Sequence, residues 1–221
     1  MFTQRTRTIV STLSLSFALA SVTACKSEVD EKPKAKVEEA GKVEPKPAEA
    51  TPDATSKSLA LMTEGSKIGF IGAKVTGDHK GSFDKFSGTA TVDGEKLTSM
   101  EIVVEVGSMT TDAEQLTGHL LSADFFEAEK HPQAKFTSLE ITEKAGEGGA
   151  THEISGNLEM RGEAKKVTFP AMLHVSDGKV HGTAAFSVDR KLWGIVYAGK
   201  PDDLIKDDVA LELELSFASA A

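Results

Sequence analysis

The chain has 221 residues, of which 39% are hydrophobic and 27% are charged, and it carries a formal net charge of −9. These proportions are typical of a soluble globular protein with a sizeable core rather than of a membrane span. The acidic balance argues against nucleic acid or anionic lipid headgroups as electrostatic partners. Because the chain contains a single cysteine, its stability has to come from packing and not from disulfide bonds.

The N-terminal residues predict export and a lipid anchor. Arg5 and Arg7 precede a mostly apolar run over residues 9–20, which is the order of a secretory signal peptide. The run is too short to cross a membrane, because a transmembrane helix needs about 20 apolar residues. Cys25 follows the small residues Val-Thr-Ala, and this sequence resembles the lipobox of bacterial lipoproteins, in which the new N-terminal cysteine is acylated. We therefore expect residues 1–24 to be removed and Cys25 to be lipidated, with cleavage beside an incidental cysteine as the alternative.

The next segment, residues 25–57, has the composition of a disordered tether. Glu, Lys, Ala and Pro dominate it, and its apolar content is too low to offset the entropy of ordering. A flexible chain of this length spans about 30 Å and a stretched one about 100 Å, so we expect it to hold the domain clear of the lipid headgroups. A spacer without a role has the same geometry. Lys26 stands where inner-membrane lipoproteins of enteric bacteria carry aspartate, which favours the outer membrane, facing the periplasm, over the inner membrane.

A single domain is expected over residues 58–221, and from Ser66 onward its apolar residues mostly alternate with polar ones. Alternation is the period of a β-strand. The clearest row covers residues 209–217, and further rows cover residues 100–106, 167–175, 180–188, 67–75, 83–92, 134–142 and 153–160. Turn sequences separate the rows, and Asp177-Gly178 between two of them predicts a β-hairpin.

One segment breaks this period. Residues 112–129 place Leu116, Leu120 and Phe125 near helical spacing, with Asp112 as the expected N-cap. About eight antiparallel strands with one helical insertion predict an all-β, up-and-down barrel, because closure removes exposed edges and such a barrel can hold one small ligand. A sandwich of two sheets is the alternative, since alternation is the same in both architectures.

Several short sequences occur along this domain in a distinctive order. The most specific run extends from His119 to Phe136 and contains His-Leu, Asp-Phe-Phe, His-Pro and a final Phe; others cover residues 66–70, 81–88, 108–112, 156–162 and 190–195. Together they resemble the YceI-like family of secreted bacterial proteins from Ser66 to the C-terminus. The chain departs from the family pattern at Thr117-Gly118 and at Leu192-Trp193.

The resemblance implies a lipocalin-like antiparallel barrel in the bacterial envelope that encloses an extended apolar ligand, typically a polyisoprenoid. A lumen lined by Phe, Leu and Val is dry, and each methylene group moved into it gains about 0.8 kcal/mol. We expect side chains of one strand parity to line it, although each of them can instead fill a packed core. The candidate lining residues are Phe70, Phe86, Val104, Phe136, Phe169, Leu173, Phe186, Trp193 and Leu213.

Two polar residues are further candidates for ligand binding. His119 lies five residues before Asp124 and can meet a headgroup or act as a base, although a histidine in such a place is more often only hydrogen-bonded. Arg190, like Lys200, can pair with a phosphate under a flap at Tyr197, and an ordinary salt bridge to nearby aspartates is the plainer alternative.

No enzyme activity, metal or cofactor is expected, apart from a bound isoprenoid-type lipid. The sequence has no nucleophile elbow, phosphate-binding loop or dinucleotide fingerprint, and its six histidines lie at no metal-ligand spacing. The expected protein is a membrane-anchored lipoprotein that carries or sequesters an amphiphilic lipid. The alternatives are an interaction or stress-protection protein with a packed barrel, and an enzyme that modifies the bound lipid with His119 and Asp124 as acid–base partners.

Overall fold

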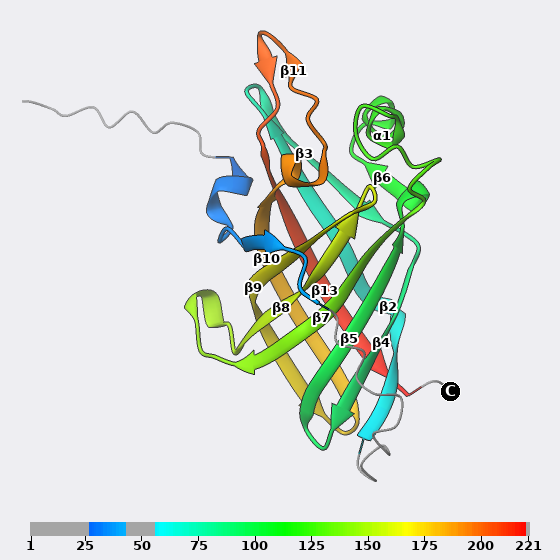
Figure 1. Cartoon of the computed structure of the whole chain (residues 1–221), viewed down its shortest axis with the longest axis vertical. Helices are drawn as coiled ribbons and strands as arrows, with labels where there is room; N and C mark the ends of the chain where they lie inside the picture. Colours follow the sequence, from blue (N-terminus) through cyan, green and yellow to red (C-terminus); the bar gives the residue numbers. More distant parts are fainter. Residues whose placement is uncertain (1–26, 43–55, 220–221) are drawn as a thin grey trace, which may run out of the picture.

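The computed structural model describes residues 27–42 and 56–219 (Figure 1). The predicted signal peptide, Cys25 and residues 43–55 of the predicted tether lie outside the described residues. Within the described ranges, no helix is both long enough and apolar enough to cross a membrane.

Long antiparallel strands form a closed wall. In hydrogen-bonded order they are β2, β4, β5, β7, β8, β9, β10 and β13, and β13 then pairs with β2 again. This second pairing of β13 joins the two edges of the sheet. The predicted up-and-down barrel is therefore confirmed, and the two-sheet alternative is wrong. The strands are β2 (Ser56–Lys74), β4 (Phe86–Asp93), β5 (Lys96–Glu105), β7 (Gln133–Glu143), β8 (His152–Met160), β9 (Glu163–Ser176), β10 (Lys179–Asp189) and β13 (Asp208–Ala218).

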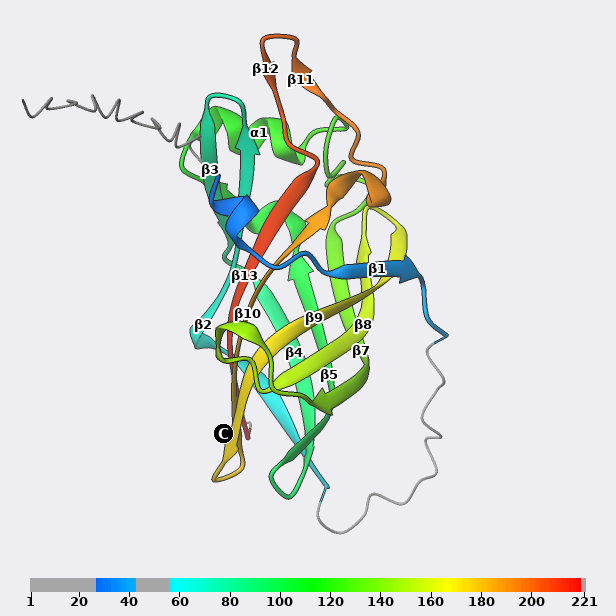
Figure 2. The same ribbon diagram turned by 90° about the vertical axis from the view of Figure 1, so that its left-hand side faces the viewer.

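Shorter elements gather at one end of the barrel, which is uppermost in Figures 1 and 2. There β3 pairs with the second half of β2, and β6 pairs with β3. Helix α1 and the small β11–β12 hairpin stand at the same end, whereas the β4–β5 and β9–β10 turns lie at the opposite end. The elements at this end include β3 (Gly77–Phe83), β6 (Met109–Thr111), β11 (Gly199–Lys200), β12 (Asp203–Leu204) and α1 (Glu114–Leu121). The other short elements are β1 (Lys36–Glu39) and the 3₁₀ turns η1 (Glu28–Glu31), η2 (Val106–Ser108), η3 (Glu147–Gly149) and η4 (Arg190–Trp193).

Side chains alternate between the two faces of the wall as the strand period requires. On β13, Leu213 and Leu215 face the interior, while Glu214 between them is exposed. The predicted hairpin at Asp177-Gly178 joins β9 to β10, and its two residues have φ angles of 52° and 68°. Positive φ at both central residues is the requirement of a type I′ turn, which explains the Asp-Gly sequence.

The helix is shorter than the predicted residues 112–129. It covers Glu114–Leu121, and its N-cap is Ala113, which makes no side-chain capping hydrogen bond. Asp112 does not cap the helix, because its carboxylate lies 2.9 Å from Nδ1 of His79 on β3. Asp112 therefore pairs with His79, which is distant in the sequence, instead of capping the helix that follows it.

Part of the segment expected to be disordered is folded against the barrel. Residues 27–42, here called the N-terminal strap, form η1 and β1 and lie across the outer wall (Figure 2). Val29 is only 1% exposed and clusters with Ile71, Ala73 and Ala210. The prediction of a disordered tether is therefore wrong for the strap.

The strap fills a gap in the wall. β9 and β10 pair directly only near their shared hairpin. Beyond it, the facing edges of the two strands have no hydrogen bonds to each other. On one side, Lys36–Glu39 pairs antiparallel with Lys165–Thr168 of β9. On the other side, the Ala35 amide donates to the Ser187 carbonyl of β10, and the Ser187 amide donates to the Pro33 carbonyl, both at 2.9 Å. Composition could not reveal that the strap is folded, because its hydrogen-bond partners are the unpaired edges of strands that are distant in the sequence.

Val37→Asp is expected to release the strap. Val37 packs against the main core and pairs with Val167, which is fully buried, so a carboxylate there should lower the free energy of unfolding by about 1–3 kcal/mol. Lys36→Asp is the matched control because Lys36 is exposed. Chemical denaturation measures the free energy, and limited digestion with a glutamate-specific protease, whose sites in the strap neither variant removes, reports its release. Equal behaviour of the two variants would contradict a closing role for the strap.

Candidate functional site

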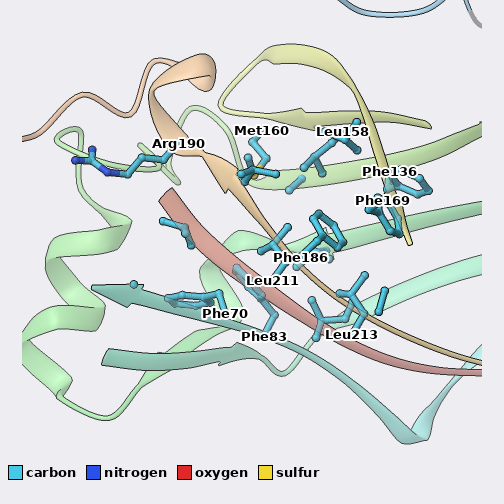
Figure 3. A pocket seen from close by; sticks show the side chains of 18 of the residues that line it. Phe70, Phe83, Phe136, Leu158, Met160, Phe169, Phe186, Arg190, Leu211 and Leu213 are labelled. Atoms are coloured by element: carbon cyan, nitrogen blue, oxygen red, sulfur yellow. The ribbon is translucent and has the colours of Figure 1, made fainter. Parts of the chain in front are cut away.

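The barrel interior contains a cavity of about 440 Å³, within the range of roughly 300–1,000 Å³ found for small-molecule sites. Every wall strand except β4 contributes side chains to its lining. The lining is mostly apolar, so a ligand inside would be held by hydrophobic contact and not by a network of hydrogen bonds. Figure 3 shows the principal apolar side chains, which are Phe70, Phe83, Phe136, Leu158, Met160, Phe169, Phe186, Leu211 and Leu213.

The cavity opens at the end that carries α1 and the β11–β12 hairpin, here called the mouth. Its polar lining residues include Lys74, His79, His119, Lys200 and Asp203, all of which are partly or fully exposed. The opposite end is closed by apolar side chains that are at most 2% exposed, including Leu59, Val92, Val180 and Phe217. A ligand would therefore place its apolar part inside and its polar part at the mouth.

Aromatic rings give the cavity flat and rigid walls. Phe169 and Phe186 are stacked with ring centroids 4.1 Å apart and planes 12° apart, and Phe136 lies 5.8 Å from Phe169. Phe70 and Phe83 form a second pair at 5.7 Å. Such contacts between rings stabilise one arrangement of the side chains beyond simple burial.

Two glycines leave room for these rings. A Cβ atom at Gly81 would overlap the ring of Phe70, and one at Gly156 would overlap the ring of Phe136. Phe70 and Gly81 are also directly paired across β2 and β3. Glycine is therefore required at both positions for the phenylalanine rings to lie flat against the wall.

The structure brings most of the predicted site residues together. Nine of them line the cavity, namely Phe70, Val104, His119, Phe136, Phe169, Leu173, Phe186, Arg190 and Leu213. Their role in ligand binding remains a prediction. The alternation of the strands was a sufficient signal for the apolar members, since the residues predicted to face inward do so.

Two predicted lining residues lie elsewhere. Trp193 belongs to η4, has no exposed surface and donates from Nε1 to the Leu158 carbonyl at 2.9 Å, so it packs in the core outside the cavity lining. Phe86 pairs with Val104 and packs against the same core, but β4 does not contribute to the lining. Phe86 lies opposite the lining residue Val104 and still takes no part in the lining, and Trp193 belongs to a 3₁₀ turn, to which strand parity does not apply.

The prediction missed several lining residues. Phe83, Leu158, Met160 and Leu211 line the cavity, and the alternation of their strands was a signal that could have identified them. Lys74 has the same parity as Phe70 on β2 and also lines the cavity, but its charge gave no reason to expect it in an apolar lining.

His119 lies at the mouth among aromatic rings. Its ring makes edge contacts with Phe125 and Tyr197 at centroid distances of 5.0 and 4.9 Å. Its Nε2 lies 3.0 Å from Oδ2 of Asp124, so the predicted pairing of these residues occurs. Tyr197 also lines the cavity, and the cluster of His119, Phe125 and Tyr197 therefore covers one side of the mouth.

Arg190 is the buried cation of the cavity lining and extends away from the phenylalanines (Figure 3). Nε donates to the Lys206 carbonyl at 3.0 Å, and Nη1 donates to the Ile195 carbonyl at 2.6 Å. Burial lowers the pKa of the guanidinium, whereas the carboxylates of Asp207 and Asp189 act in the opposite direction. Nη2 makes no hydrogen bond to any described residue and lies 3.7 Å from the Asp207 carboxylate. Arg190 thus holds the loop before β13 through two backbone carbonyls and an ion pair.

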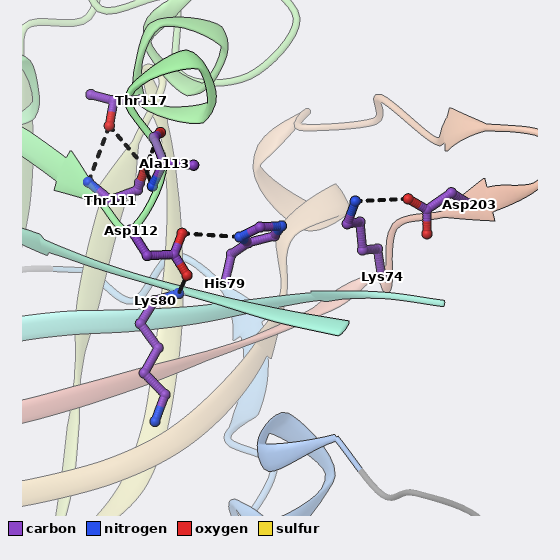
Figure 4. Close-up of polar contacts among 8 residues, drawn as sticks. All are labelled: Lys74, His79, Lys80, Thr111, Asp112, Ala113, Thr117 and Asp203. Atoms are coloured by element: carbon purple, nitrogen blue, oxygen red, sulfur yellow. Dashed lines mark hydrogen bonds and ion pairs between the residues drawn. The ribbon is translucent and has the colours of Figure 1, made fainter. Parts of the chain in front are cut away.

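An ion pair ties the β11–β12 hairpin to the barrel rim. Lys74 Nζ at the end of β2 lies 2.8 Å from Asp203, and the neighbouring pair of His79 and Asp112 joins β3 to the helical segment (Figure 4). The hydrogen bond from Lys74 holds the pKa of the Asp203 carboxyl below its usual value, with Thr76 adding to the effect and burial opposing it.

Asp203→Asn is expected to loosen the hairpin over residues 199–206. Because the folded pKa of Asp203 is lowered, the contact is fully present above the usual aspartate pKa and is lost as the pH falls below about 4. Hydrogen exchange is therefore measured peptide by peptide and expressed relative to the intrinsic exchange rate at each pH. The protection of the hairpin should fall in wild type on acidification and be low at both pH values in the variant. Unchanged exchange in the variant at neutral pH would show that the ion pair does not restrain the hairpin.

Comparison with known proteins agrees with this architecture. A family model described as the YceI-like domain matches residues 59–217. A UPF0312 protein of Pectobacterium carotovorum is 37% identical over 95 residues, which cover 42% of this chain and 47% of that protein. One from Pseudomonas putida is 35% identical over 101 residues, covering 45% and 50%. The chain thus spans about half the length of the curated relatives it matches.

Two solved structures share the fold. BcnA of Burkholderia cenocepacia superposes with a TM-score of 0.61 at 21% identity, covering 71% of this chain and 98% of that chain. A polyisoprenoid binding domain of Saccharophagus degradans superposes with a TM-score of 0.58 at 13% identity, covering 73% and 98%. The family model spans the whole barrel, from β2 to β13, and the chain belongs to the YceI-like family.

Proposed function

We propose that this protein is an envelope lipoprotein that binds a polyisoprenoid or a similar amphiphilic lipid inside its barrel, and so carries or sequesters it. The observation that carries the proposal is the apolar cavity, closed at one end and polar at its mouth. This shape suits a ligand with one long apolar part and one polar end. Membership of the YceI-like family and the polyisoprenoid binding domain of the S. degradans neighbour support the same ligand class.

The energetics favour recognition by chain length. Each five-carbon isoprenoid unit that leaves water gains about 4 kcal/mol, because each buried carbon contributes about 0.8 kcal/mol. The polar side chains of the lining, among them His119 and Lys200 at the mouth and the buried Arg190, are the groups available to orient a headgroup. Affinity should therefore rise with chain length until the cavity is full and respond less to the headgroup.

The direct test is native mass spectrometry of the full chain, purified from its own membranes in mild detergent. A lipid adduct that organic solvent removes and chromatography identifies is the expected result. The delipidated protein is then titrated with prenyl alcohols of increasing length. Absence of an adduct together with equal, weak affinity for all lengths would overturn the proposal.

The anchor and location form a separate part of the proposal. Cys25 after Val-Thr-Ala supports acylation, and Lys26 after it supports the outer membrane, facing the periplasm. Metabolic labelling with palmitate should modify the wild type and not Cys25→Ala, and density-gradient fractionation should place the wild type in the outer membrane. Labelling of neither protein would exclude the anchor while leaving the lipid-binding barrel intact.

A reaction on the bound lipid is the second candidate, and the 3.0 Å contact between His119 and Asp124 at the mouth is the observation that favours it. If these residues act as acid–base partners, the bound lipid should change in mass during incubation with wild type and not with His119→Ala. A lipid that leaves both proteins unchanged would remove this candidate and retain the carrier.

A further inference from the structure

We propose that the mouth of the barrel docks directly on a lipid bilayer, with an apolar rim in contact with the membrane and the anchor of Cys25 held beside it. The orientation rests on the proposed function for the anchor, whereas the rim is a property of the described residues. In this arrangement the anchor is joined to the folded strap by the short link between Cys25 and Ser27, and not by the long tether predicted from composition.

The rim consists of the three most exposed large apolar side chains among the described residues. Val75 is 74% exposed, Val196 63% and Leu204 50%. Each is a sequence neighbour of residues that line the cavity, and the Val75 amide donates to the Leu204 carbonyl at 3.1 Å. Exposed apolar residues gathered around the opening of an apolar cavity are costly in water and are typical of an interaction surface.

The first residues of the strap lie at this same end of the barrel. The Ser27 hydroxyl donates to Asp78 at 2.8 Å, and the Glu28 amide donates to the other oxygen of Asp78 at 2.7 Å. Asp78 is the second residue of β3, three residues beyond Val75 in the sequence. Val29, buried against the wall, holds η1 in place.

Chain length then limits how far the domain can stand from its anchor. Only two peptide units separate Cys25 from Ser27, and two extended residues span at most about 7 Å. A flexible tether of the full predicted length would have allowed about 30 Å. An acyl group on Cys25 therefore leaves the rim next to the headgroups, and the mouth faces the bilayer.

Charge at the mouth favours apolar contact over electrostatic attraction. Two lysines near the rim are paired with carboxylates: Lys80 lies 2.6 Å from Glu28, and Lys74 lies 2.8 Å from Asp203, whereas Lys200 is exposed at the mouth. The net charge of −9 also opposes attraction to anionic headgroups. Docking should therefore occur on zwitterionic phosphatidylcholine and change little with salt concentration.

The experiment places a tryptophan at the rim of the acylated full chain in phosphatidylcholine vesicles with brominated acyl chains. Val75→Trp should lose about half of its added fluorescence, because an interfacial indole lies within reach of the bromine atoms. Met62→Trp is the matched control, since Met62 is 41% exposed on β2, the strand that ends just before Val75, but lies about 40 Å back along the chain from Val75. Trp193, which is fully buried, gives the same background in every variant. Leu204→Trp repeats the test if Val75→Trp fails to fold.

Equal quenching at the rim and at residue 62 would overturn the proposal. Val29→Ser in the Val75→Trp chain tests the short link, because unseating η1 should abolish most of the quenching while acylation and vesicle binding persist. Persistent quenching in this variant would show that the strap does not orient the barrel. Native mass spectra of the same samples report acylation and the cavity lipid separately, so a failed lipid carrier and a failed docking surface give different results.

Discussion

Ala184→Trp is expected to abolish lipid binding while the barrel remains folded. Ala184 lines the cavity from β10 opposite Leu213, so an indole there occupies space that a lipid chain would fill. Loss of room for five methylene groups costs about 4 kcal/mol at 0.8 kcal/mol each. This corresponds to a Kd weaker by roughly a thousandfold. Native mass spectrometry should then show the chain without its lipid adduct, and titration with prenyl alcohols should show the weaker Kd.

Glu214→Trp is the matched control for this variant. Glu214 is exposed on β13, immediately after Leu213, so the same indole is added on the outer face of the same part of the wall. It should leave the lipid adduct and Kd unchanged, and circular dichroism should show both variants folded. Normal lipid binding by Ala184→Trp would mean that the ligand lies outside the barrel.

Trp193→Ala is expected to give the largest loss of stability without a direct effect on the ligand. Trp193 is completely buried and belongs to the main core, and truncation of such a side chain costs about 3–5 kcal/mol. For a domain of this size the Tm should fall by roughly 10 °C. Thermal and chemical denaturation measure both quantities.

Trp193→Phe separates packing from hydrogen bonding. It keeps an aromatic ring but removes the bond from Nε1 to the Leu158 carbonyl, which should cost about 1–3 kcal/mol because a buried acceptor loses its partner. At temperatures where both variants are folded, their lipid Kd should equal that of wild type, since Trp193 does not line the cavity. A selective loss of lipid binding in Trp193→Ala would restore the original prediction that this residue contacts the ligand.

The arrangement of the wall was predictable because its signal is local. Alternation along residues 209–217 and 180–188 identified β13 and β10 and the parity of their inward faces, and Asp177-Gly178 identified the turn between β9 and β10. A side chain's face in a strand follows from its own position in the row, so no information about distant residues is needed.

The helix and the site depended on partners far away in the sequence. Asp112 has the chemistry of an N-cap, but His79 on β3 takes its carboxylate. Trp193 has the chemistry of a lining residue, but the Leu158 carbonyl holds it in the core. Each side chain could have made a local or a ligand contact, but in the fold it bonds to a residue that is distant in the sequence.

Composition and periodicity were enough to define an all-β domain with an apolar inward face, because hydrophobic patterning acts residue by residue along each strand. They could not show that the cavity stays open, that β4 takes no part in its lining or that the strap completes the wall. Those features arise where strands from distant parts of the chain meet. The edges left by β9 and β10 order a polar segment that has too few apolar residues to order itself.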